Sequence, residues 1–161
     1  MVSFGGDQKI DPPASNEQNW FENDDHNFLD LGVVTVQQVL KLKVYNYNYI
    51  EYVPKSDPIQ DMHNFNRPVE IKVFFGDWCK DSKKVVPAFL KIMEFSSNPN
   101  IAVTYINLSP DKKKPADLVS GWNIQSVPTF VVLQDGGEVG RIVETPRLTL
   151  EEDLYGILAS L

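Results

Sequence analysis

The sequence predicts an α/β fold, with a central mixed β-sheet of four or five strands flanked by helices. Short apolar runs alternate with amphipathic stretches of helical period through the middle of the chain, a pattern typical of parallel strands joined by helices. A glycine-containing turn then divides two strand-like runs near the end, which predicts a hairpin. The expected order of elements is therefore β-α-β-α-β-α-β-β-α.

Residues 1–44 are predicted to be an N-terminal extension, and residues 45–161 the folded domain. Residues 1–27 are polar and rich in Asn, Asp and Pro, so we expect a mobile or loosely docked arm. Three aromatic side chains are candidates for pinning this arm to the domain: Trp20, Phe21 and Phe28.

The segment after the arm allows two interpretations. "GVVTV" favours a strand, whereas Val36, Val39 and Leu40 recur at helical spacing; of the two, we favour a short helix over residues 35–43. The next segment, "YNYNYIEYV" at residues 45–53, alternates aromatic and polar side chains. That alternation predicts a strand with one packed face.

The middle of the chain predicts a helix, a strand and a longer helix. "SDPIQDMHNF" offers Ser56 or Asp57 as a cap and a proline in the first turn, so a short helix is expected there. "VEIKVFF" at residues 69–75 is apolar enough at its end to be a strand buried on both faces. After a turn, an apolar stripe predicts a helix from about residue 79 to 95. Pro87 lies inside that helix and should kink it.

The remaining elements follow from turn and capping signals. "NIAVTYINL" at residues 100–108 predicts a strand, and a short helix ended by Gly121 is expected after it. The hairpin covers residues 127–144, with its turn at Asp135-Gly136-Gly137. The chain closes with an amphipathic helix for which Thr149 is the expected cap.

Composition excludes several classes of function. The 161-residue chain has a net charge of −7 and shows no basic face, which argues against nucleic-acid binding. A single cysteine excludes an internal disulfide. His26 and His63 lie far apart in sequence with no cysteine at ligand spacing, which argues against a Cys/His zinc site. We therefore expect no metal and no cofactor.

No signal for a membrane or for secretion is apparent in the sequence. No apolar run approaches the roughly 18 residues of a membrane span, and the first residues lack the features of a secretory signal. We expect a cytoplasmic protein, or a periplasmic one if a signal peptide has been removed.

The chain's only cysteine, Cys79, lies where an apolar strand gives way to a helix. Helix N-termini carry unpaired N–H groups and partial positive charge, which stabilise a thiolate. Lys80, Lys83 and Lys84 add positive charge, while Asp77 and Asp81 oppose it. The alternative is that Cys79 is a small buried hydrophobic residue, as most single cysteines are.

Four features together resemble the thioredoxin family. "FFGDWCKDSKKVVPAFL" is similar to the family's active-site strand, loop and helix, including its helix-kinking proline. "IQSVPTFVVL" resembles the family's cis-proline segment, and "DGGEVGRIVE" its terminal hairpin. The motif W-C-x-D-S narrows the resemblance to bacterial thioredoxin-like proteins with one cysteine in a CxxS arrangement.

The resemblance implies roles for particular residues. Cys79 matches the attacking thiol, with Trp78 as its flanking aromatic and Lys80 and Asp81 as the residues between the two motif positions. Val127 and Pro128 match the pair joined by a cis bond beside the thiol, whose backbone binds an extended substrate.

Two positions depart from the family pattern. Ser82 stands where the resolving cysteine would be, and Val73 where many thioredoxins bury an aspartate. A hydroxyl cannot attack a mixed disulfide, so the two-cysteine cycle cannot finish within this chain. Ser82 is instead a candidate donor of a hydrogen bond to the Cys79 sulfur.

Glu144 falls near a position where the family has glycine, so it is a candidate for selecting partners. The other interpretation is that Arg141 and Glu144 form a surface charge pair on the last strand.

The expected function is thiol–disulfide exchange by Cys79 alone, with protein or low-molecular-weight thiols and disulfides, glutathione among them, as partners. The alternative is a non-catalytic binding or chaperone-like module that keeps the proline platform. Oxidation of Cys79 to sulfenic acid ranks lower. A monomer is expected, and a Cys79-linked dimer is the other arrangement that one free thiol allows.

Overall fold

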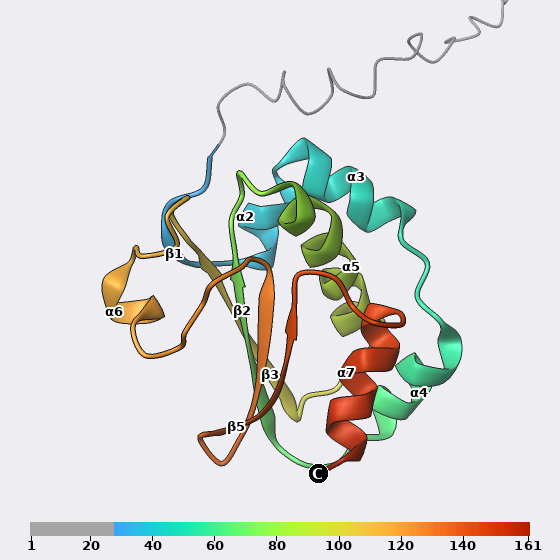
Figure 1. Cartoon of the computed structure of the whole chain (residues 1–161). Helices are drawn as coiled ribbons and strands as arrows, with labels where there is room; N and C mark the ends of the chain where they lie inside the picture. The colour runs from blue at the N-terminus through green and yellow to red at the C-terminus, as the bar shows by residue number, and fades with distance from the viewer. Residues whose placement is uncertain (1–27) are drawn as a thin grey trace, which may run out of the picture.

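The computed structural model describes residues 28–161; the predicted arm, with Trp20 and Phe21, lies outside the described residues. A five-stranded mixed sheet runs in the order β1-β3-β2-β4-β5 (Figure 1), which confirms the predicted fold class. The strands are β1 (Gly32–Val34), β2 (Val69–Phe75), β3 (Ile101–Asn107), β4 (Thr129–Gln134) and β5 (Gly137–Val143). The helices are α2 (Val36–Leu40), α3 (Lys43–Glu51), α4 (Ser56–Asn64), α5 (Lys80–Ser96), α6 (Ala116–Val119) and α7 (Leu150–Ala159).

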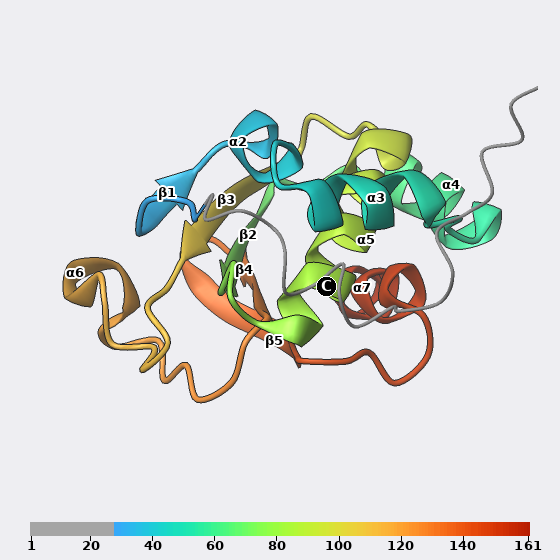
Figure 2. The same ribbon diagram turned by 90° about the horizontal axis from the view of Figure 1, so that it is seen from above.

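The helices cover the two faces of the sheet unequally. Helices α3, α4, α5 and α7 lie on one side, and α6 lies on the other (Figures 1 and 2). Side chains alternate along β2 accordingly, because Val73 and Phe75 belong to the larger core and Phe74 to the smaller cluster that includes Val119 of α6. Strands β2 and β3 are parallel, so their carboxyl ends meet at one edge of the sheet.

Helix α5 fills the larger core. Phe89 has no exposed surface, and its ring centroid lies 4.9 Å from that of Phe130; burying such a side chain contributes about 1.5–3 kcal/mol. Pro87 lies inside α5 as predicted and has no N–H to give the carbonyl of Lys83. Asn48 Nδ2, from α3, donates to that carbonyl at 2.8 Å. The neighbouring helix thus supplies the hydrogen bond that the proline removes.

The predicted strand at residues 45–53 is wrong, because these residues form α3 and the turn after it. Tyrosines at alternate positions suit a strand, but Tyr45, Tyr49 and Tyr52 also recur at helical spacing. Tyr45 is 1% exposed and Tyr47 is 64% exposed, so the helical spacing is the one that the core uses. Packing against α5 decided between two periods that the same tyrosines satisfy.

The sheet begins before the predicted boundary at residues 44 and 45. Gly32–Val34 form β1, which pairs antiparallel with β3, and Thr35 caps α2 with a reciprocal capping box. Both interpretations of this segment therefore hold for part of it, although the helix ends at Leu40 rather than at residue 43. Phe28, a predicted anchor of the arm, is 70% exposed.

The other predicted elements are confirmed, with small shifts at their ends. Asp135 and Gly136 both have positive φ, of 51° and 78°, which is the conformation of a two-residue hairpin turn. The cap of α4 was predicted wrongly: its N-cap is Lys55, and Ser56 and Asp57 lie inside the helix.

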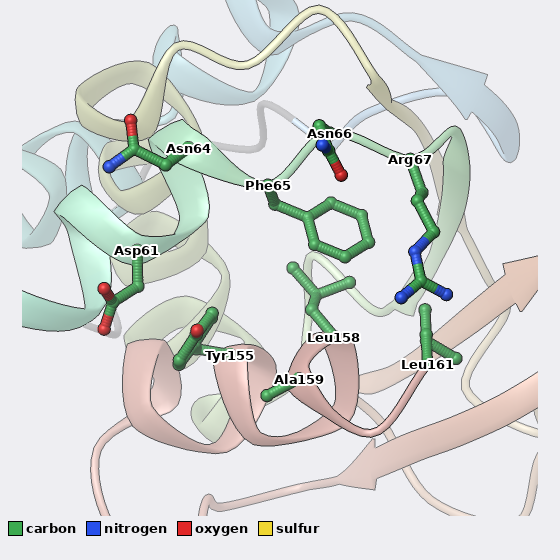
Figure 3. Close-up of a pocket in the computed structure, with 9 residues that line it drawn as sticks. All are labelled: Asp61, Asn64, Phe65, Asn66, Arg67, Tyr155, Leu158, Ala159 and Leu161. Atoms are coloured by element: carbon green, nitrogen blue, oxygen red, sulfur yellow. The ribbon is translucent and has the colours of Figure 1, made fainter.

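An open pocket of about 270 Å³ lies between the ends of α4 and α7 (Figure 3). Phe65, Arg67 and Tyr155 are among the residues that line it. The pocket is slightly smaller than typical small-molecule sites. It contains none of the site residues predicted from the sequence, and it adjoins the segment that leads into β2 rather than the end of β2 that leads to Cys79.

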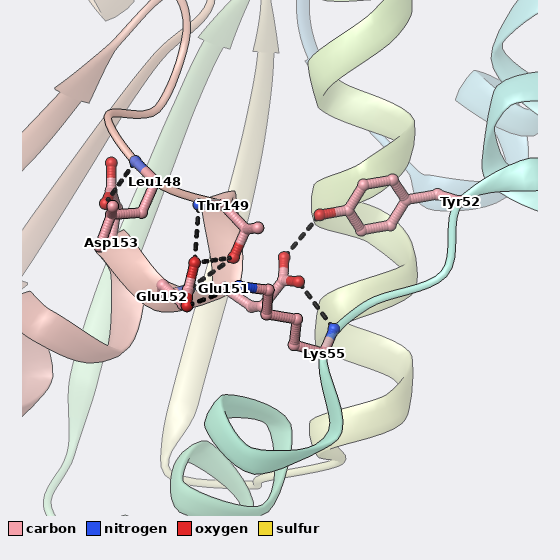
Figure 4. Close-up of polar contacts among 7 residues, drawn as sticks. All are labelled: Tyr52, Lys55, Leu148, Thr149, Glu151, Glu152 and Asp153. Atoms are coloured by element: carbon pink, nitrogen blue, oxygen red, sulfur yellow. Dashed lines mark hydrogen bonds and ion pairs between the residues drawn. The ribbon is translucent and has the colours of Figure 1, made fainter.

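The start of α7 is tied to the connection between α3 and α4 (Figure 4). Glu151 is 1% exposed and accepts hydrogen bonds from the Tyr52 hydroxyl at 2.5 Å and the Lys55 N–H at 2.7 Å. Burial, followed by the bond to Glu151, raises the pKa of Tyr52. Thr149 caps the helix as predicted, with Glu152 completing the capping box.

Candidate functional site

The candidate site lies at the carboxyl ends of the parallel strands, where ligands of open α/β sheets commonly bind. The chain leaves β2 at Phe75, turns through Gly76, Asp77 and Trp78, and enters α5. Cys79 is the N-cap residue of α5, with extended backbone and no side-chain cap bond. Its N–H donates to the carbonyl of Gly76 at 2.9 Å, which closes the turn and fixes where the thiol emerges.

The structure brings Cys79 and the predicted proline segment together. The Cys79 thiol is partly exposed and donates to the carbonyl of Val127, with 3.4 Å between Sγ and the oxygen. The Val127–Pro128 bond is cis, and both residues are buried. A thiol held against the backbone of a second segment is placed to meet a sulfur presented there.

Three contacts hold the indole ring of Trp78 in place. Its Nε1–H donates to the carbonyl of Leu108 at 2.8 Å, and the ring covers Gly76. A Cβ on Gly76 would lie 2.4 Å from the ring, so only glycine fits beneath it. On another side, the Lys112 ammonium lies 5.9 Å from the ring centroid, within reach of a cation–π interaction.

Ser82 has a different hydrogen-bond partner from the one predicted. Its side chain has no exposed surface, and its hydroxyl oxygen accepts the N–H of Gly76 at 3.2 Å. The sequence had suggested a bond to the sulfur of Cys79. Ser82 lies in the first turn of α5, and its hydroxyl stabilises the turn before Cys79 by accepting this hydrogen bond.

The remaining predicted residues lie around the thiol with different exposures. Lys80 and Asp81 are exposed on the first turn of α5. Glu144 is exposed, has a φ of 60° and donates its N–H to the carbonyl of Pro128 at 2.7 Å. The interpretation of Arg141 and Glu144 as a charge pair is wrong, because Arg141 pairs with Glu138.

Sequence reasoning missed the network beneath the turn. Asp77 is 6% exposed; its Oδ2 accepts the Leu29 N–H at 2.7 Å, and its own N–H donates to Asn107 Oδ1 at 3.0 Å. Burial raises the pKa of Asp77, while hydrogen bonds to its carboxylate from the Leu29 N–H and the Asn107 side chain oppose the shift. Tyr45 donates to the carbonyl of Gly76 at 3.1 Å. The partners lie 30 or more residues away in sequence, so no local pattern could have revealed them.

Val73 is fully buried in the core beneath the site, among apolar residues that include Phe130. No carboxylate stands at this position, as the sequence shows. Within residues 28–161, no group of three or more His, Cys, Asp or Glu side chains is placed to hold a metal ion. In the same range no helix is long and apolar enough to cross a membrane.

Comparison with known proteins identifies what the chain is similar to. A family model described as "Thioredoxin" matches residues 34–152. Thioredoxin H2-1 of Oryza sativa is 26% identical over 106 residues, which cover 66% of this chain and 72% of the rice protein. Thioredoxin H9 of Arabidopsis thaliana is 29% identical over 87 residues, which cover 54% of this chain but only 58% of the Arabidopsis protein.

One solved structure shows the same arrangement over most of the chain. A protein of unknown function from Pseudomonas aeruginosa matches with a TM-score of 0.51 and 20% identity, covering 90% of this chain and 96% of that one. At this identity the likeness speaks for the fold alone.

Proposed function

The chain belongs to the thioredoxin family, and from that membership we propose that it carries out thiol–disulfide exchange with Cys79 as its single attacking thiol. The observation that carries the proposal is the position of Cys79: partly exposed, at the N-cap of α5, with Sγ 3.4 Å from the carbonyl oxygen of Val127. In the proposed reaction the attacking species is the thiolate of Cys79.

The proposed reaction has two steps. In the first, the Cys79 thiolate attacks one sulfur of a partner disulfide; a bond forms between the two sulfurs, the partner's own S–S bond breaks, and its second sulfur leaves as a thiolate that takes a proton from water. In the second, an external thiolate attacks the partner sulfur of the mixed disulfide; a bond forms between those two sulfurs, the bond to the Cys79 sulfur breaks, and Cys79 leaves as a thiolate. Ser82 cannot perform the second step, because an alcohol is not a competent nucleophile for it.

The external thiol is proposed to be a protein thiol or a small one such as glutathione. The proposed compartment is the cytoplasm, where a reducing thiol pool is maintained. In this cycle the protein works as a monomer. Non-reducing electrophoresis distinguishes it from a dimer linked through Cys79.

The direct test is to incubate the full chain with glutathione disulfide and follow the intact mass. One glutathione should add to the wild-type chain and none to Cys79→Ser, and the adduct should persist until a dithiol is added. If no adduct forms although Cys79 of the unfolded chain still reacts with a thiol reagent, the proposal is contradicted.

The second candidate is a non-catalytic binding or chaperone-like module, and the absence of a second thiol from the sequence favours it. It predicts that Cys79→Ser binds extended peptides as well as the wild-type chain does, as measured by fluorescence anisotropy. The first candidate predicts that stable capture depends on Cys79.

A further inference from the structure

Two segments bring lysines to the same edge of the sheet as Cys79. The first two turns of α5 carry one group, and the connection between β3 and α6 carries the other. We call them the lysine rim: Lys80, Lys83, Lys84, Lys112, Lys113 and Lys114. β2 and β3 are paired in parallel up to Phe75 and Asn107, and the Leu108 N–H then donates to the Phe75 carbonyl at 2.8 Å. The two segments therefore start side by side.

Lys112 is held in place by the loop that carries it. Its φ is 60°, and its N–H donates to the carbonyl of Ser109 at 2.8 Å. The loop closes through Ser109 N–H to the Lys114 carbonyl at 3.0 Å, and Asp111 accepts both the Ser109 hydroxyl and the Lys113 N–H. This ordered loop places the Lys112 ammonium 5.9 Å from the ring centroid of Trp78, which is the residue that precedes Cys79.

The charge of the rim is not consumed within the described part of the chain. Among residues 28–161 the ion pairs join Lys55 to Glu152, Lys72 to Glu70 and Arg141 to Glu138, so no lysine of the rim takes part in one.

Acidic groups offset the rim only in part. Asp81 and Asp111 lie in the same two segments, Asp117 lies in α6, Glu144 follows β5, and buried Asp77 is close enough to Lys83 for the lysine to favour its ionised form. Six lysines outnumber the two aspartates of their own segments, and they exceed these five acidic groups together by one. The two segments that carry the rim are thus positive in a chain whose net charge is −7.

We infer that the lysine rim selects protein disulfides whose attacked cysteine is flanked by aspartate or glutamate. This inference rests on the proposed function and names its substrate class. Acidic side chains on the partner complement the rim and steer the encounter. The same positive charge stabilises the partner thiolate that leaves when the bond between the Cys79 sulfur and the attacked sulfur forms. Lys112 is the proposed specificity residue, since its ammonium lies 5.9 Å from the ring centroid of Trp78, the residue that precedes Cys79.

The test compares two matched peptides, each with one cysteine activated as a mixed disulfide with the coloured thiol 5-thio-2-nitrobenzoate. Aspartates flank the cysteine in one peptide and lysines in the other. With the full chain in low salt, the acidic peptide should release the coloured thiolate about 3- to 10-fold faster, and the ratio should approach one at about 0.5 M salt because exposed charges are then screened. Equal rates, or a ratio that salt does not change, overturn the inference.

Two variants locate the effect. Lys112→Gln should slow the acidic peptide about 2- to 3-fold, because one attractive charge is lost, and should speed the basic peptide, because the same charge repels it. Lys91→Gln is the matched control, because it removes the same charge from α5 about 18 Å along the helix from Cys79; it should change neither rate. If Lys112→Gln slows both peptides equally, the residue acts by positioning Trp78, and selection by charge is wrong.

Binding without reaction separates this inference from the proposed function. S-methylated, fluorescently labelled versions of both peptides cannot exchange disulfides, and their anisotropy reports binding alone. Tighter binding of the acidic peptide supports the rim even if Cys79 reacts with neither activated peptide, in which case only the proposed function fails. Equal binding together with no reaction overturns both.

Discussion

Restoring a thiol at position 82 is the most informative perturbation of the site. In the proposed cycle the wild-type chain forms a mixed disulfide through Cys79 and depends on an external thiol to release it, because the residue one turn along α5 is Ser82. Side chains three residues apart on a helix are neighbours, with about 5–6 Å between Cβ atoms. The variant Ser82→Cys should therefore resolve the mixed disulfide internally. After small movements of the helix start, it should be left with a disulfide between Cys79 and the introduced thiol.

The introduced thiol should speed release of the mixed disulfide greatly and lower the stability of the fold moderately. An effective concentration of about 1 M for the neighbouring thiol, far below that of well-oriented intramolecular reactions, exceeds about 1 mM external thiol by about a thousandfold. The cost comes from the Gly76 N–H, which donates to the Ser82 oxygen at 3.2 Å. A sulfur accepts this bond weakly, and an unsatisfied buried donor costs about 1–3 kcal/mol.

The assay is acid quenching followed by intact-mass measurement of the mixed disulfide with a peptide, over time, at about 1 mM external thiol. The adduct should be lost slowly from the wild-type chain, through the external thiol, and about a thousandfold faster from Ser82→Cys. Ser82→Ala is the control, since it loses the same hydrogen bond without gaining a thiol; it should be less stable and lose the adduct no faster than the wild-type chain does. A persistent adduct on a folded Ser82→Cys would refute the claim that only the missing thiol prevents release.

Three further predictions concern the scaffold. Gly76→Ala should destabilise the fold by about 1–3 kcal/mol in chemical denaturation, because the new Cβ would lie 2.4 Å from the Trp78 ring; wild-type stability would show that the ring moves freely. Asn48→Leu should lower the free energy of unfolding by about 1–3 kcal/mol, because it removes the side-chain donor, at 2.8 Å, to the Lys83 carbonyl, which Pro87 has no N–H to satisfy. An unchanged denaturation midpoint would contradict this. The hydrogen bonds of Glu152 to Lys55 and Thr149 lower its pKa from 4.5 to about 2, so its contribution to stability is complete above pH 4.5 and is lost as the pH falls towards 2. The difference in unfolding free energy between the wild-type chain and Glu152→Gln should therefore shrink over that window, and a difference independent of pH would refute the assignment.

Local signals predicted the elements whose own residues determine them. Thr149 with Glu152 three residues later specifies a capping box, and Asp135-Gly136 supplies the two positive φ values of a hairpin turn. The segment at 45–53 failed because its tyrosines fit both periods, and only the neighbouring α5 distinguishes them. Local pattern is therefore a reliable guide where one conformation satisfies it, and not where tertiary packing selects between two.

The site divides in the same way. The sequence indicated that Cys79 and Val127 would meet, although 48 residues separate them, because the family resemblance supplied the long-range information. It gave no sign that Asp77 would anchor the backbone of Leu29, a contact also across 48 residues. A turn aspartate such as Asp77 is expected to be exposed from its sequence alone, but the folded N-terminal segment covers it. Long-range polar contacts of this kind need the three-dimensional structure.

Ser82 and Val73 show that this site differs from a two-cysteine site in its buried surroundings as well as in the missing second sulfur. The Ser82 hydroxyl is buried and holds the Gly76 N–H, so it has a structural task that a sulfur performs poorly. Val73 packs without exposure in the same core as Phe130, and a carboxylate there would be buried without a partner at a cost of several kcal/mol. The interior that would activate a second thiol is therefore occupied by apolar packing. A thiol introduced at position 82 has to act without a buried base, so we expect Ser82→Cys to release its adducts through proximity, and only to the extent that proximity allows.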